Sequence, residues 1–371
     1  MSALARAAPV GGRAALLVNV GTPASPSVRD VRRYLAEFLN DPRVIDIPTP
    51  LRWMLLNLII LPFRPSKSAH AYQQIWTPEG SPLLINSKKQ VEALSVALPG
   101  QHVVLAMSYG KPSLEDALTS LLARGVTRIT LVPMYPHYAS ATTGGTVEAW
   151  HKLLGAQVQP PASAVLPAFY DSPGFISALA ANIQQTVATA RPDHVLFSYH
   201  GLPIRQLAPY CSDAAAGKAC GPLGPNHLHC YRAQCLATTE LLLTATGLTA
   251  TTSTAFQSRI KGTTWLSPFT DEVVVELAKK GVKRLVVACP AFVADCLETL
   301  EEIDQEARAA FLQAGGAEFH HLPCLNDQHE WIAALAALAI RHMQGWPTTV
   351  QADPATLEAQ RLRALARGAT A

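Results

Sequence analysis

Residues 195–203, VLFSYHGLP, decide the fold class of this chain. An apolar run of strand length ends in a histidine, and a glycine and a proline follow within three residues. Such a run is typical of a strand in a parallel sheet, because both faces of that sheet are covered. Gly201 lets the backbone turn tightly, and Pro203 fixes the conformation after the turn. We therefore expect His200 to stand at the end of a strand.

A second apolar run, residues 285–288, leads into residues 289–302, CPAFVADCLETLEE. Residues just past the carboxyl ends of parallel strands meet in one crevice, so we expect His200 and Glu298 to face each other. An imidazole opposite a carboxylate binds a divalent metal, moves protons, or does both. The alternative is that His200 is a structural histidine of the core.

A row of carboxylates follows Glu298. If the chain turns helical near Asp295, then Glu298, Glu302 and Glu306 lie four residues apart on one helix face. Like charges at this spacing repel, and no basic residue occurs between residues 285 and 307 to offset them. A solvated acidic face is the alternative. The row predicts a path for a divalent cation or for protons, and carboxylate with imidazole suits Fe(II).

Strand and helix patterns alternate along the first part of the chain. Residues 14–20, 103–107 and 129–133 have the apolar character of buried strands. Residues 27–38 and 114–124 have apolar side chains at helical spacing. Strands separated by helix-length segments indicate a doubly wound α/β fold with a parallel sheet.

The chain also repeats itself. Residues 122–133 resemble residues 277–288, since both run from a helix end through glycine, valine and a basic residue into a strand. Residues 17–23 parallel residues 196–203 in the same way. The repeat predicts two similar α/β lobes, and ligands commonly bind in the cleft between lobes. A coincidence of two βαβ units is the alternative.

The expected domains follow from that repeat. We expect a flexible N-terminal arm (1–13), an N-terminal Rossmann-like lobe (14–170), a C-terminal Rossmann-like lobe (171–345) and a C-terminal tail (346–371). The C-terminal lobe carries a cysteine-rich insertion at residues 211–235.

Composition narrows the class of protein. The chain has 371 residues, 49% of them hydrophobic, which is ample for a large core. The net charge is only +3 and no dense Lys/Arg run occurs, so we expect no nucleic-acid partner. No signal-peptide core begins the chain, and we expect a cytoplasmic protein.

One apolar stretch, residues 51–62 (LRWMLLNLIILP), is far short of the roughly 20 residues that a membrane-spanning helix needs. It fits either a buried helix or an apolar lip. An apolar lip would accept a hydrophobic ligand or contact a membrane surface, so peripheral membrane association is an expectation.

Taken together, these motifs resemble those of the protoporphyrin ferrochelatases, also called haem synthases, which insert Fe(II) into protoporphyrin IX. The matching motifs are residues 18–23, 198–203, 256–259, 265–272 and 294–303. The resemblance implies two Rossmann-like lobes around a porphyrin cleft, with protoporphyrin IX and Fe²⁺ as substrates. It also implies that His200 and Glu298 are the catalytic, metal-binding pair.

The resemblance extends to the pocket. Tyr109, Trp265, Ile45 and Gln257 match positions that line the porphyrin site, and residues 51–62 match the lip of the cleft. Metal insertion needs a base for two pyrrole protons. The pattern leaves two assignments open: His200 accepts the protons while Glu298 receives the metal or passes protons outward, or the roles are reversed.

The chain also departs from the family pattern. Ser108 stands where the family often has arginine before the tyrosine, which puts a contact to a porphyrin carboxylate in doubt, and Lys111 is a candidate substitute. Ala291 stands where glycine is common.

Four cysteines, Cys211, Cys220, Cys230 and Cys235, fall in the insertion. A bacterial ferrochelatase subclass that the chain resembles holds an internal [2Fe–2S] cluster on four cysteines, and thiolates suit such clusters. The alternatives are a zinc site that includes His227 or His229, and free cysteines. Disulfides are not expected in the cytosol.

Two other functions stay open from the sequence. One is a chelatase that acts on another tetrapyrrole such as coproporphyrin, or on another metal. The other is a carrier that binds porphyrin or haem without turnover. A carrier has no use for the acidic row after Glu298, so the row favours an enzyme.

Overall fold

The computed structural model describes residues 12–207, 229–259, 264–346 and 354–368. They form two four-stranded sheets, both parallel, with strand orders β2-β1-β3-β4 and β6-β5-β7-β8. The strands are β1 (Arg13–Thr22), β2 (His102–Gly110), β3 (Arg128–Pro133), β4 (Ala162–Val165), β5 (His194–His200), β6 (Thr251–Gln257), β7 (Arg284–Ala288) and β8 (Glu318–His321). The equivalent orders confirm two similar doubly wound α/β lobes.

Helices cover both sheets. In the first half of the chain they are α1 (Val28–Asn40), α2 (Thr49–Met54), η1 (Leu55–Ile60), α3 (Leu61–Ile75), α4 (Pro82–Ala97), α5 (Leu114–Ala123), η2 (Ser140–Gly144) and α6 (Gly145–Gly155). In the second half they are α7 (Pro173–Ala190), α8 (Ile204–Leu207), α10 (Tyr231–Thr246), α11 (Thr270–Lys279), η4 (Glu298–Ala307), α12 (Arg308–Gln313), α13 (His329–His342) and α14 (Pro354–Leu365). The η segments are π-helical.

Local sequence explains where several helices begin. Ser27 caps α1 by accepting the N–H of Asp30, and Ser113 opens α5 in a reciprocal capping box with Asp116. The predicted strands and the two predicted helices of the N-terminal lobe are confirmed within a few residues at each end. The predicted acidic helix is also present, but it begins at Glu298 and is π-helical rather than α-helical.

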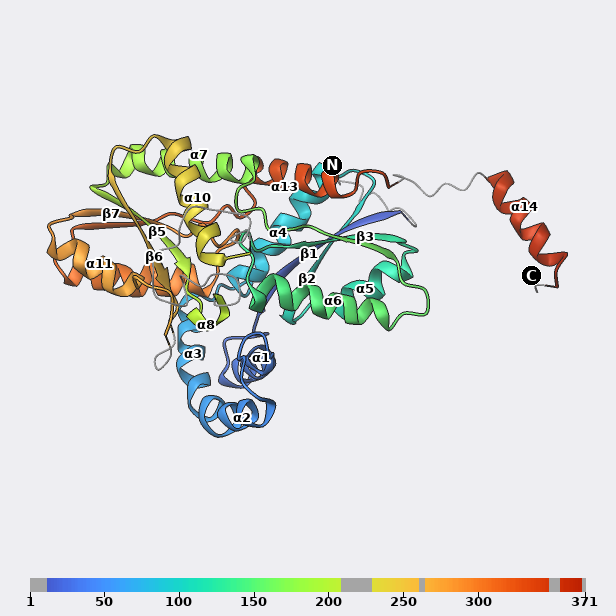
Figure 1. Cartoon of the computed structure of the whole chain (residues 1–371), viewed down its shortest axis with the longest axis horizontal. Coiled ribbons are helices and arrows are strands. Elements are labelled where there is room, and N and C mark those ends of the chain that lie inside the picture. Colours follow the sequence, from blue (N-terminus) through green and yellow to red (C-terminus); the bar gives the residue numbers. More distant parts are fainter. Residues whose placement is uncertain (1–11, 208–228, 260–263, 347–353, 369–371) are drawn as a thin grey trace.

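The first strand of each half is central in its sheet, and it alternates its side chains between two cores. In β1, Ala15 and Leu17 join one core while Leu16 and Val18 join the other. Figure 1 shows α7 and α13 along one side of the molecule and α11, α6 and α5 along the other, with the sheets between them. His200 therefore ends a central strand at the point where the strand order reverses.

The two lobes share one apolar core. A single cluster of buried side chains includes Leu17 and Leu94 from the first lobe and Phe197 and Trp331 from the second. Helix α13 packs against α4 of the first lobe as well as α7 of the second. The boundaries expected at residues 170 and 345 stay predictions, but α13 packs against both lobes.

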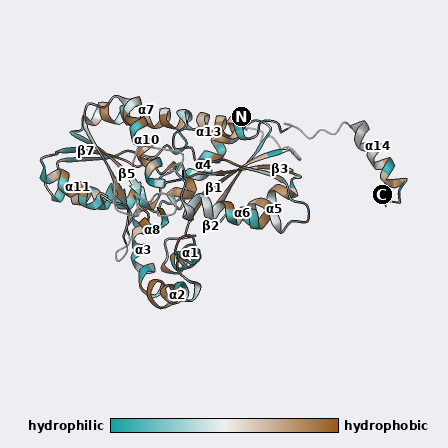
Figure 2. Ribbon diagram, in the orientation of Figure 1, coloured by the Kyte–Doolittle hydropathy of each residue, from teal (hydrophilic) through white to brown (hydrophobic). Residues whose placement is uncertain are grey.

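Helices α1, α2, η1 and α3 project from the body as a separate layer (Figure 1). Figure 2 shows hydrophobic residues on α2 at the tip of this layer. The exposed side chains there, which we call the lip residues, are Leu51, Trp53, Met54, Leu58 and Ile59, each at least half exposed. The alternative of a fully buried helix is therefore wrong for residues 51–62. No helix in the described part of the chain is long and apolar enough to span a membrane.

Candidate active site

His200 ends β5 with its imidazole partly exposed. Its Nδ1 lies 2.6 Å from the carbonyl oxygen of Gly201. A carbonyl only accepts hydrogen bonds, so Nδ1 carries the proton and Nε2 keeps its lone pair. The hydroxyl of Tyr231 donates to the carbonyl of His200 at 2.9 Å and fixes the backbone behind the ring. The arrangement presents Nε2 as a base or as a metal ligand.

The turn after His200 needs a glycine. A Cβ on Gly201 would lie 2.8 Å from the carbonyl oxygen of Gln257 and 3.3 Å from the ring of Trp265. Pro203 pairs with Trp265 in an isolated β-bridge. The buried Trp265 indole is thus held directly against the turn that presents His200.

Glu298 is the first residue of η4 and is partly exposed. The turn before it is built on Asp295, which is buried. The carboxylate of Asp295 accepts hydrogen bonds from the Thr299 hydroxyl at 3.0 Å, the Cys324 N–H at 3.2 Å and the Asn326 amide at 2.7 Å. Asp295 therefore anchors the start of the helix, and its part in a metal or proton path stays a prediction.

Glu302 follows Glu298 by four residues and is held by Ser258. The backbone N–H of Ser258 donates to Glu302 Oε1 at 2.6 Å, and its hydroxyl donates to Oε2. Burial raises the pKa of Glu302, while Ser258 and the charge of a protonated His200 lower it and Glu298 raises it. Gln257 pairs with His200 in the sheet and donates to the Glu298 carbonyl and to the Glu302 carboxylate, so this one residue links all three. Glu306, farther along, is exposed.

The first lobe supplies an apolar wall. Tyr109, at the end of β2, donates to Asp41 Oδ2 at 2.8 Å and meets the Phe38 ring edge-on at 5.1 Å. Ile45 belongs to the same apolar cluster. Leu297 and Leu300, on either side of Glu298, pack against that cluster too. Tyr109 and Ile45 are therefore brought toward the Glu298 helix.

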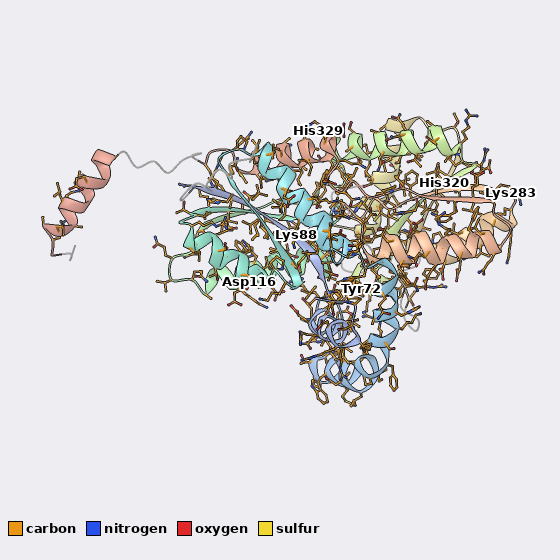
Figure 3. The ribbon with its side chains drawn as sticks, turned by 180° about the vertical axis from the view of Figure 1, so that it is seen from behind. Tyr72, Lys88, Asp116, Lys283, His320 and His329 are labelled. Atoms are coloured by element: carbon orange, nitrogen blue, oxygen red, sulfur yellow. The ribbon has the colours of Figure 1, made fainter. Side chains whose placement is uncertain are left out.

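Two further tyrosines near Glu298 were not singled out from the sequence. Tyr34 and Tyr72 are both buried, and Tyr34 donates to the carbonyl of Gly21 at 3.1 Å. Burial raises the pKa of both hydroxyls, and the neighbouring Glu298 carboxylate raises it further. Figure 3 shows Tyr72 on α3, where the projecting helices meet the lobes. In the sequence each tyrosine looks like one more apolar residue of a helix.

Ser108 and Lys111, where the chain departs from the family pattern, both bond to side chains of the protein. The hydroxyl of Ser108 bonds to Thr146 at 2.8 Å and to Tyr135 at 3.3 Å. Lys111 pairs with Asp116 at 2.7 Å, and its side chain is 75% exposed. Lys111 is therefore occupied at the start of α5.

Half of the predicted cysteine cluster can be described. Cys230 and Cys235 are fully buried at the start of α10, while Cys211, Cys220 and His227 lie outside the described residues. Burial raises the pKa of the Cys235 thiol. Buried thiols are suitable donors for a soft metal, so these two residues fit an iron–sulfur cluster by donor type. Within the described ranges, no three or more His, Cys, Asp or Glu side chains are grouped to hold a metal ion.

The fold resembles solved structures of other proteins. "SirB from Bacillus subtilis with Fe3+" superposes with a TM-score of 0.54 at 11% identity, covering 89% of this chain and 95% of that one. The sirohydrochlorin chelatase SirB from Bacillus subtilis subspecies spizizenii, in complex with cobalt, gives a TM-score of 0.52 at 9% identity, with the same coverage. At such identities the likeness shows the fold alone.

Sequence comparison identifies the family. The Ferrochelatase family model matches residues 12–343. A ferrochelatase of Methylibium petroleiphilum is 45% identical over 364 residues, which cover 96% of this chain and 95% of the relative. A ferrochelatase of Opitutus terrae is 46% identical over 331 residues, covering 87% and 96%. The chain therefore belongs to the Ferrochelatase family.

Proposed function

We propose that this chain is a ferrochelatase, which inserts Fe(II) into protoporphyrin IX and releases two protons to give protohaem. The family match over residues 12–343 carries the proposal. The chemistry of the site agrees with it, because an imidazole with a free Nε2 stands near the start of an acidic helix. Metal insertion needs a base for the pyrrole protons and anionic groups for the cation.

His200 is the base in this proposal. Its Nδ1 is committed to the Gly201 carbonyl, so Nε2 accepts a pyrrole proton and the ring becomes a cation. Glu298 receives the metal or passes protons outward, and Glu302 and Glu306 continue the path along η4. Metal entry and proton release thus share one negative surface.

Tyr109, Ile45 and Trp265 line the porphyrin slot in this proposal. A flat apolar macrocycle needs apolar walls with a few polar anchors. The apolar cluster around Tyr109 supports this, as does the position of Trp265 against the His200 turn.

Cys230 and Cys235, with Cys211 and Cys220, are proposed to hold a [2Fe–2S] cluster. When bound, such a cluster supplies one-electron redox chemistry and cross-links the chain. Anaerobically purified protein should contain about two iron atoms and two acid-labile sulfides per chain, as a [2Fe–2S] cluster requires. Anaerobic protein without sulfide or visible absorbance would end this part of the proposal.

The protein is further proposed to act in the cytoplasm with peripheral membrane contact. The five exposed lip residues support the contact, because an apolar patch rimmed by polar residues commonly marks an interaction site.

The deciding experiment is anaerobic turnover with Fe(II) and protoporphyrin IX, run beside coproporphyrin III. We expect catalytic formation of protohaem. Faster turnover of coproporphyrin would change the substrate and keep the mechanism. Tight, stoichiometric porphyrin binding without turnover would contradict the enzyme and make the protein a carrier.

A further inference from the structure

Gln257 stands between His200 and the helix that begins at Glu298. It ends β6 in register with His200 at the end of β5. Its carbonyl oxygen accepts the N–H of Gly201 at 2.8 Å. Its side chain is buried, with the whole residue only 3% exposed. The backbone of Gln257 thus holds the turn after His200, and its side chain points into protein.

Each polar atom of the Gln257 amide has partners. Nε2 donates to the carbonyl oxygen of Glu298 at 2.8 Å and to Glu302 Oε2 at 3.4 Å. Oε1 accepts from the Ser198 hydroxyl at 2.8 Å and from the Cys289 thiol at 3.7 Å. A primary amide has two N–H groups and two lone pairs, so all four are in use. One side chain therefore ties β5, the end of β7 and the first turn of η4 together.

The next residue completes the attachment. Ser258 has a φ of 66°, an uncommon conformation for a residue with a Cβ. In this conformation both its N–H and its hydroxyl reach the carboxylate of Glu302. Together, Gln257 and Ser258 hold η4 by the Glu298 carbonyl and by the Glu302 carboxylate.

We propose that Gln257 is a positioning residue, which sets the separation between the His200 imidazole and the Glu298 carboxylate through its amide. The proposal rests on the proposed chelatase function. It gives Gln257 a positioning role in place of the direct porphyrin contact that the family resemblance implies. Loss of the amide leaves the partly buried Glu298 carbonyl without this partner and frees the first turn of η4 to shift. A shift of about 1 Å between catalytic groups costs on the order of 100-fold in rate.

The test compares three variants. Gln257→Met keeps the volume and removes every hydrogen bond of the amide, and Gln257→Glu replaces the Nε2 donor by an oxygen facing Glu298 and Glu302. Ser163→Ala is the control, because Ser163 lies on β4 of the other sheet, where its hydroxyl accepts a hydrogen bond from the Trp150 side chain. We expect kcat to fall about 30- to 100-fold in both Gln257 variants. Porphyrin dissociation constants should stay within about threefold, and Ser163→Ala should keep its kcat within about threefold.

Measuring kcat and the porphyrin dissociation constant separately distinguishes a positioning residue from a residue of the porphyrin pocket. A rise of about tenfold or more in the porphyrin dissociation constant, with kcat retained, would make Gln257 a pocket residue and overturn the proposal. Unchanged kcat in folded Gln257→Met would overturn it too. If the wild-type protein has no turnover, the proposed function fails separately. A crystal structure of either Gln257 variant then tests the positioning role alone. We expect the first turn of η4 to have shifted, and an unshifted turn would overturn the proposal.

Discussion

At the residue scale, a single backbone contact sets the chemistry of His200. Donation from Nδ1 to the Gly201 carbonyl fixes the tautomer and leaves Nε2 as the basic atom. That contact depends on the tight turn at Gly201, which Gln257 and Trp265 surround so closely that a Cβ would collide. The position of His200 at a strand end could be predicted from the sequence, but its tautomer could not.

The first prediction concerns the proposed catalytic pair. His200→Ala and Glu298→Gln should each lower kcat by about 10²- to 10⁴-fold, the usual contribution of a positioned proton-transfer group. Porphyrin binding, followed by fluorescence titration, should remain because both side chains act on the metal and protons. Glu276→Gln, an exposed carboxylate on α11, is the control. Near-normal turnover in either variant would remove that residue from the pair.

The second prediction concerns the backbone at the end of β1. A Cβ on Gly21 would lie 1.8 Å from the carbonyl oxygen of Tyr109, and the φ of 109° already disfavours a side chain. Gly21→Ala should lower the free energy of unfolding by at least about 3 kcal/mol in urea denaturation. Gly100→Ala is the matched control, because its φ is 77° with open space around it. It should cost only about 1–2 kcal/mol, and equal losses would contradict the steric argument.

At the element scale, the acidic helix is the informative departure from expectation. The sequence predicts a helix from near Asp295 with carboxylates four residues apart on one face, and the structure shows that residues 298–307 form a π-helix. The i→i+5 bonding of a π-helix is rare and is frequently found at functional sites. Here Gln257 and Ser258 capture the Glu298 carbonyl and the Glu302 carboxylate. Because these contacts come from a distant strand, no local pattern could predict the wider helix.

The third prediction is a pH dependence in this helix. Burial and the negative charges of Glu306 and Glu302 raise the pKa of the Glu301 carboxyl to about 7. The positive charge of Lys67 lowers this pKa and offsets only part of the rise. The folded protein then binds more protons than the unfolded chain between about pH 4.5 and 7, so stability falls as pH rises through that window. Allowing for solvent screening, Glu301→Gln should stabilise the protein by on the order of 1–2 kcal/mol at pH 8 and by almost nothing at pH 4.

Urea denaturation at the two pH values measures this difference, and Glu276→Gln again serves as the exposed control. Stabilisation of Glu301→Gln that is the same at both pH values would show that charge on Glu301 is not the cause.

At the scale of the whole molecule, the two lobes are tied together. Gln90 on α4 donates to the carbonyls of Val293 at 2.9 Å and Asn326 at 2.8 Å, both in the second lobe. Arg13 reaches the carbonyls of Met343 and Trp346. With the shared core and α13, these contacts make the body one unit. The projecting layer of α1, α2, η1 and α3 extends away from that unit (Figure 1).

The fourth prediction concerns that layer. The double variant Trp53→Asp with Ile59→Asp should weaken binding to vesicles of phosphatidylethanolamine and phosphatidylglycerol by roughly 100-fold or more, because each buried apolar side chain contributes about 1.5–3 kcal/mol. Co-sedimentation measures the partitioning. Val158→Asp changes a fully exposed valine elsewhere and should have little effect. Equal binding of wild type and double variant would exclude the lip as the membrane contact.

The sequence by itself determined the fold class, the two similar lobes and the strand-end position of His200. These features rest on hydrophobic periodicity and on glycine and proline at turns, which are local properties of the chain. The family also follows from its motifs. Only the tertiary structure decided the tautomer of His200, the π-helix after Glu298 and the shared core of the lobes. It also brought Tyr34 and Tyr72 to the site and gave Gln257 its contacts with η4, because each depends on contacts between segments far apart in sequence.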